Sequence, residues 1–243
     1  MNISGSGHIP AGEYQEKVSI SGSGKIDGNL RCLELSCSGA ARAEGEIECV
    51  EKARFSGSAH LEKGIRAKSI SASGALKVGG SICVQNDLHC SGGVKCGGNL
   101  KAGQIKCSGA IEVANDIETE YFDSSGRVIC KGLLNAERIN ISIDGTGSEI
   151  GSIGGSEIKI YCERTVKRIT RMPLLSKLVG GTNGTLTVHE LIEGDTVALE
   201  SVKAPRAVGR VVAIGADCEI SLVQYSEEIE IHPDAKVGKC EKI

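Results

Sequence analysis

The feature that most constrains this chain is a Ser-Gly dipeptide that recurs at an almost fixed interval. Eight copies follow one another, and the interval between them is about 17 to 18 residues, a period typical of stacked repeats. They are Ser4-Gly5, Ser21-Gly22, Ser38-Gly39, Ser56-Gly57, Ser73-Gly74, Ser91-Gly92, Ser108-Gly109 and Ser125-Gly126. A repeat this short cannot bury its apolar side alone and has to stack on its neighbours, which is the signature of a solenoid. The spacing therefore predicts a stack of coils, each as long as one Ser-Gly interval.

Within each repeat, apolar or small residues alternate with polar ones, as in strands that bury one face. In the repeat that follows Gly74, the inward positions are Leu76, Val78, Ile82, Val84, Leu88 and Cys90. Three pairs of inward residues predict three short strands in each coil. We therefore expect an all-β fold, a single-stranded β-helix with triangular coils, over residues 1–160.

A second glycine column lies between the first and second strand of each coil. Its members are Gly28, Gly45, Gly64, Gly80, Gly98 and Gly132. Asn115 stands in the same column, and Asn is the residue other than Gly that best tolerates a left-handed backbone. The column therefore predicts positive φ at this corner. A nucleotide-binding loop is disfavoured because these glycines precede no amphipathic helix.

The composition suits a narrow interior. The chain has 33 Gly but only 2 Phe, 4 Tyr and no Trp, so small aliphatic side chains have to fill the core. A net charge of -3 with both signs interspersed gives no electrostatic footprint for nucleic acid. No apolar run approaches the roughly 20 residues that a membrane-spanning helix needs.

Eleven cysteines raise the question of disulfides or metal. Their number is odd, no Cys-x-x-Cys occurs, and the first residues lack the features of a signal peptide, so we expect free thiols in a reducing cytoplasm. Cys37, Cys90 and Cys107 share one inward column, Cys32 and Cys49 another, and Cys96 and Cys130 a third, where they would pack as small apolar residues. Cys83 points outward in this register and is the thiol most exposed to reaction.

Residues 161–185 interrupt the pattern with a basic segment. Its cations are Arg164, Lys167, Arg168, Arg171 and Lys177. The favoured interpretation is a loop or hairpin that leaves the solenoid, since insertions in repeat proteins map to loops. The alternative is a contact with an anionic membrane or a partner protein.

Residues 186–243 resume a repeat. Gly194, Val197 and Leu199 are echoed 21 residues later by Gly215, Cys218 and Ile220. This predicts further solenoid coils of 21 residues with a longer corner.

The sequence predicts no catalytic, cofactor-binding or metal-binding residues. None of the five histidines has a spacing that suggests metal ligands. The sharpest enzymatic alternative is a left-handed hexapeptide-repeat acyltransferase, which also stacks three strands per coil. Coils of that class have one strict length, whereas here the Ser-Gly interval alternates between two lengths.

The stretch Ser19 to Leu30 and its echoes resemble the bactofilins, a bacterial family of polymer-forming cytoskeletal proteins, over about residues 1–140. The resemblance implies a right-handed β-helix that polymerises end to end without nucleotide. It also implies filaments or sheets that recruit other proteins, often at the inner face of the membrane, and no catalytic residues. Two features depart from the family. The repeat begins already at Ile3, and a long further stretch of chain follows the matching region.

The end of a solenoid is an unpaired sheet edge, which soluble solenoids cover with an atypical repeat. The repeat starts in register at Ile3, so we expect the first coil, from Ile3 to Ala11, to be the self-association surface. Ile3, Ile9 and Ala11 are its predicted contacts. A competing hypothesis is a monomeric binding module that uses the basic segment.

Overall fold

A computed structural model describes residues 1–143, 147–162 and 184–243. These residues form β-strands joined by turns and contain no helix, and their strand pairings are parallel. The predicted β-solenoid is therefore confirmed. The chain divides into two compact units, Met1–Tyr121 and Phe122–Ile243.

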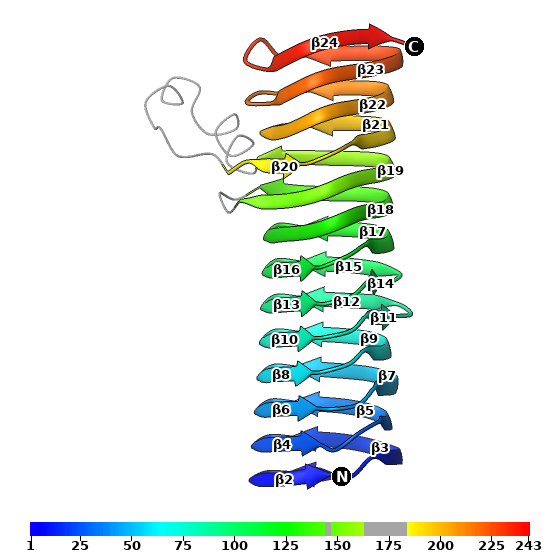
Figure 1. Cartoon of the computed structure of the whole chain (residues 1–243), viewed down its shortest axis with the longest axis vertical. Helices are drawn as coiled ribbons and strands as arrows, with labels where there is room; N and C mark the ends of the chain where they lie inside the picture. The colour runs from blue at the N-terminus through cyan, green and yellow to red at the C-terminus, as the bar shows by residue number, and fades with distance from the viewer. Residues whose placement is uncertain (144–146, 163–183) are drawn as a thin grey trace, which may run out of the picture. The chain divides into compact units, whose positions relative to one another are not determined.

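The first unit stacks coil upon coil, so that strands one coil apart in sequence are neighbours in space (Figure 1). Its strands are β1 (Asn2–Ile3), β2 (Ser6–Ile9), β3 (Gly12–Ile20), β4 (Ser23–Ile26), β5 (Leu30–Cys37), β6 (Ala40–Ala43), β7 (Ile47–Phe55), β8 (Ser58–Leu61), β9 (Ile65–Ala72), β10 (Ala75–Val78), β11 (Ile82–Val84), β12 (Asp87–Cys90), β13 (Gly93–Cys96), β14 (Leu100–Lys101), β15 (Gln104–Cys107) and β16 (Ala110–Val113). Strand β17 (Ile117–Ser124) begins in this unit.

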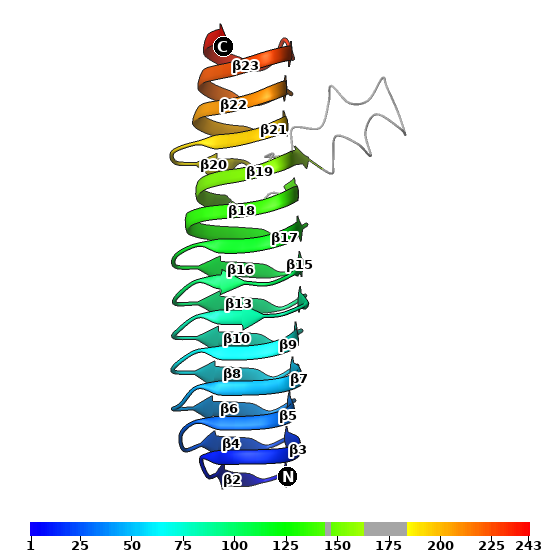
Figure 2. The ribbon, with the colours of Figure 1, turned by 90° about the vertical axis from the view of Figure 1, so that its right-hand side faces the viewer.

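Each coil has three faces, as predicted. Strands β4, β6, β8 and β10 stack on one face (Figure 2). The longer strands β5, β7 and β9 bend at a bulge and so contribute to the other two faces.

The variation in coil length occurs at a bulge between β5 and β7. Cys32 pairs with Cys49 and Glu34 with Lys52, so one residue of β5 faces two residues of β7. The extra residue of this coil is thus absorbed in a β-bulge, which inserts one residue in one strand while the pairing on either side is kept. The Ser-Gly corner keeps its register because the length variation occurs elsewhere.

Inward side chains stack in columns along the coils. In one column Leu35 lies on Ala53, Ala53 on Ile70 and Ile70 on Leu88, and all four are at most 2% exposed. Phe55 is 1% exposed and is among the largest buried side chains. Small and large residues share these columns, which keeps the narrow interior filled.

The predicted positive φ at the second glycine column is wrong. Among the described residues only Gly12, Ser201 and Asp217 have positive φ, and Asn115 does not. The glycines instead allow the backbones of successive coils to approach closely at this corner. A Cβ added to Gly45 would lie 2.1 Å from the carbonyl carbon of Gly28 on the preceding coil.

The Ser-Gly column is packed still more tightly. A Cβ added to Gly39 would lie 2.0 Å from the carbonyl oxygen of Gly22, and one added to Gly74 would lie 2.0 Å from that of Gly57. No side chain fits between these corners, so the ladder marks where successive backbones touch.

The second unit is also a stack of parallel strands. They are β18 (Arg127–Ile143), β19 (Ser148–Cys162), β20 (Leu186–Val188), β21 (Ile192–Leu199), β22 (Val202–Ile214), β23 (Glu219–Ile231) and β24 (Lys236–Lys242). Further solenoid coils in residues 186–243 are therefore confirmed.

The predicted 21-residue repeat is wrong. Gly194 stacks on Gly209 and Val212 stacks on Ile229, so the coils from β21 to β23 are shorter than the sequence echo suggested. The echo compared residues on different faces, because Val197 pairs with Val212 whereas Cys218 lies at the corner before β23.

Candidate functional site: the terminal coils and a corner groove

The first coil contains the predicted self-association residues, and the structure separates them. Ile3 pairs with Ile20 and is partly exposed, and Ala11 is exposed at a corner. Ile9 is 0% exposed, since it points into the interior against Ile26. Ile3 and Ala11 are thus accessible for a contact, and Ile9 is a core residue.

The last coil exposes residues of the inward register that sequence reasoning missed. Ile231 pairs with the buried Ile214 but is itself 40% exposed. Cys240 pairs with the buried Val223 and is exposed, and Val237 is partly exposed. These side chains continue core columns whose outer end meets solvent in the described chain.

The outermost strands of the first and last coils form backbone hydrogen bonds along one edge. Strand β24 pairs with β23, and within the residues that the structure describes no strand pairs with its other side. Strand β2 likewise pairs with β4 alone. Within the described residues, the outer sides of β2 and β24 therefore have no strand partner.

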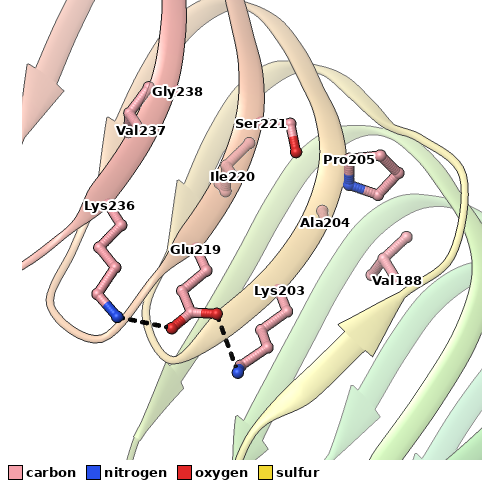
Figure 3. A pocket seen from close by; sticks show the side chains of 10 residues that line it. All are labelled: Val188, Lys203, Ala204, Pro205, Glu219, Ile220, Ser221, Lys236, Val237 and Gly238. Carbon is pink, nitrogen blue, oxygen red and sulfur yellow. Dashed lines mark hydrogen bonds and ion pairs between the residues drawn. The ribbon is translucent and has the colours of Figure 1, made fainter.

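A shallow groove of about 640 Å³ crosses the coils of β20, β22, β23 and β24 (Figure 3). Its polar edge is a ladder in which Glu219 lies 3.0 Å from Lys203 and 3.0 Å from Lys236. The remaining lining is Val188, Ala204, Pro205, Ile220, Ser221, Val237 and Gly238. Lys203, Glu219 and Lys236 are solvent-accessible and neutralise one another. This edge of the groove is therefore suited to linking neighbouring coils rather than to binding a strongly charged ligand.

A second hollow of about 290 Å³ shares this ladder and includes Cys218. Cys218 is 0% exposed, and burial raises its pKa to about 11, so it is a thiol rather than a nucleophilic thiolate at neutral pH. No group of three or more His, Cys, Asp or Glu side chains that could hold a metal ion occurs in the part of the chain that the structure describes.

Ion pairs between coils cover the outer faces. The Arg42 guanidinium (Nη2) lies 2.6 Å from Oε1 of Glu62, and Nζ of Lys95 lies 2.6 Å from Oε1 of Glu112. Each pair joins two neighbouring coils. Hydrogen bonds from Arg42 hold the pKa of the Glu62 carboxyl below its ordinary value, and those from Lys203 and Lys236 do the same for Glu219. Such exposed pairs contribute little individually.

We expect thermal stability to fall as the pH drops below about 4.5, the ordinary pKa of Glu. A carboxyl whose pKa is lower in the folded state adds stability above its unfolded pKa and loses it as the pH falls through the folded pKa. Melting temperatures at pH values of about 7, 5 and 3.5 test this, and added salt at about 1 M should reduce the difference by screening. Equal melting temperatures at the two ends of this range would contradict it.

The predicted membrane or partner contacts Arg164, Lys167, Arg168, Arg171 and Lys177 lie outside the described residues. Strand β19 ends at Cys162 before them, and β20 begins at Leu186 after them. No helix in the described ranges is long and apolar enough to cross a membrane.

The described residues thus define a β-solenoid, and they assemble no metal-binding cluster. The chain is 32% identical over 115 residues to the uncharacterized protein YhbE of Bacillus subtilis, and 31% identical over 112 residues to YhbF of the same organism. Each match covers 46% of this chain, and the chain spans 44% and 42% of these relatives. No protein-family model and no solved structure matches the chain.

Proposed function

We propose that this protein is a non-enzymatic structural scaffold that assembles end to end into polymers without nucleotide, in the manner of the bactofilins it resembles. The observation that carries the proposal is the last coil, where Ile231 and Cys240 continue core columns into solvent. An apolar column that ends in water is stabilised when another coil covers it.

A second copy of this chain fits such an end because its coils have the same strand spacing. Parallel strands lie about 4.8 Å apart. Strand β24 pairs only with the Glu219–Tyr225 part of β23, so a strand of a second copy placed on the outer side of the rest of β23 would satisfy its open hydrogen-bonding groups and bury Ile231. If the first coil of one copy meets the last coil of another, the contact is heterologous and builds a filament rather than a closed ring. Ile3 and Ala11 would then lie on the opposite side of the contact.

The proposal places the protein in the bacterial cytoplasm, with itself as the principal partner. Other proteins or the inner face of the membrane would attach to the polymer. It assigns no cofactor and no nucleotide. The faces of the coils, covered by ion pairs such as Arg42 with Glu62, would remain outward in the polymer.

We expect Ile231→Lys to weaken assembly at least about tenfold in the concentration required, because a lysine buried at the contact loses apolar burial and adds a desolvated charge. Sedimentation velocity of the full chain over a range of concentrations measures this. Ile3→Lys should have a similar effect if the first coil meets the last.

Leu33→Lys is the matched control. Leu33 is 41% exposed, close to the 40% of Ile231, but it lies at the bulged corner of β5 rather than at an end. The control should assemble like the unchanged protein. Equal assembly of Ile231→Lys and Leu33→Lys would overturn the assignment of the contact to the last coil.

A further inference from the structure

Two pairs of cysteines on neighbouring coils lie side by side within the first unit. Cys32 pairs in register with Cys49, and Cys90 pairs in register with Cys107. All four side chains are at most 3% exposed. The sulfur atoms of Cys32 and Cys49 are 3.8 Å apart.

The backbone places both pairs within reach of a disulfide. In-register residues on adjacent strands lie about 4.8 Å apart, inside the range of roughly 4.4 to 6.8 Å that Cα atoms take across a disulfide. Both side chains of each pair point into the same interior. For Cys32 and Cys49, bond formation requires the sulfurs to close from 3.8 Å to about 2.05 Å.

We infer that the pairs Cys32 with Cys49 and Cys90 with Cys107 are sites of oxidative modification, where a disulfide staples one coil to the next. Each pair loses two protons and two electrons as the S–S bond forms. A thiol oxidant accepts them: hydrogen peroxide becomes two water molecules, and an azo compound becomes a hydrazine. The product is uncharged, as an apolar interior requires.

Access to the sulfurs controls this reaction. The thiolate is the reacting form of cysteine. The hydrogen bond between the two thiols, followed by burial, raises the pKa of Cys49, and the same causes raise the pKa of Cys90. All four thiols are also buried away from a dissolved oxidant, so the closed coil reacts slowly and oxidation proceeds when a coil opens. The exposed thiols Cys83 and Cys240 react first.

The experiment treats the full chain with the azo oxidant diamide, once at room temperature and once just below the unfolding temperature. Remaining thiols are alkylated, and linked peptides are identified by mass spectrometry without reduction. We expect Cys32–Cys49 and Cys90–Cys107 links to dominate the intramolecular products of the warmed sample. The melting temperature should rise by roughly 5 °C or more and return after reduction.

Disulfides formed by random closure would join different cysteines from these two pairs. Random closure favours short loops, such as Cys32 to Cys37 or Cys90 to Cys96, over the spacing of one full coil that divides each register pair. Dominance of the short links, or full alkylation of all four buried thiols after Cys83 and Cys240 are consumed, would overturn the inference. Cys49→Ala should abolish the link at Cys32, whereas Cys37→Ala should preserve it, because Cys37 pairs with Ile20 and Phe55.

Discussion

Replacement of Gly57 by alanine is expected to lower the free energy of unfolding by about 3 kcal/mol or more. The new Cβ would lie 2.0 Å from the carbonyl oxygen of Gly39. That oxygen cannot move aside cheaply, because it accepts a hydrogen bond of 3.0 Å from the backbone N–H of Ser58. The coils would have to separate at this corner, which disturbs the pairing on both adjoining faces.

Gly93→Ala is the matched control, since a Cβ added to Gly93 would meet no atom within 4 Å. Alanine there restricts the unfolded chain and should change stability by less than about 1 kcal/mol, in the stabilising direction. Urea unfolding followed by circular dichroism measures both variants. Equal stability of the two variants would show that close stacking of the coils does not explain the glycine ladder.

The second large effect is expected for Phe55→Ala, which should cost about 3 to 5 kcal/mol. Phe55 is 1% exposed and stacks between Cys37 and Ala72, both smaller residues. Because neither neighbour can extend into the vacated space, the cavity would persist in a narrow interior. The same urea experiment measures the loss.

Two further substitutions sharpen this prediction. Phe55→Leu keeps most of the volume and should lose less stability than Phe55→Ala. Val50→Ala, at a side chain that is 46% exposed on the bulged corner, should change stability by less than about 0.5 kcal/mol. A loss for Phe55→Ala no larger than that for Val50→Ala would contradict the assignment of Phe55 to the core.

The stack of coils was predictable from the chain because two simple regularities coincide in it. The Ser-Gly spacing defines the coil, and the alternation around Gly74 defines which side chains face inward. The role of the glycines was predicted less well. A positive φ and a close backbone contact both favour glycine because it has no Cβ. The sequence therefore cannot show which of the two requires Gly45, whereas the structure shows its close contact with Gly28.

The register of the second unit illustrates a different limit. Its strands share the same alternation of apolar and polar residues, so a sequence echo can match residues on different faces. The resemblance of Val197 to Cys218 suggested coils of 21 residues, whereas Val197 pairs with Val212. Hydrogen-bonded partners, rather than similar residues, define the coil.

The candidate contact surface was only partly predictable. The start of the repeat predicts both Ile3 and Ile9 as contacts; Ile3 is accessible, but Ile9, from the same coil, is buried. In sequence, Ile231 cannot be told apart from the buried inward residues. In the structure it stacks on one of them, Ile214. Its exposure depends on whether another coil covers it, which alternation along a strand does not encode.

Negative-stain electron microscopy of the purified full chain, without nucleotide and at increasing protein concentration, tests the proposed scaffold most directly. We predict unbranched filaments or sheets that appear above a threshold concentration and are unchanged by added ATP or GTP. A uniform population of single particles at every concentration, with a monomeric mass in sedimentation, would contradict end-to-end assembly.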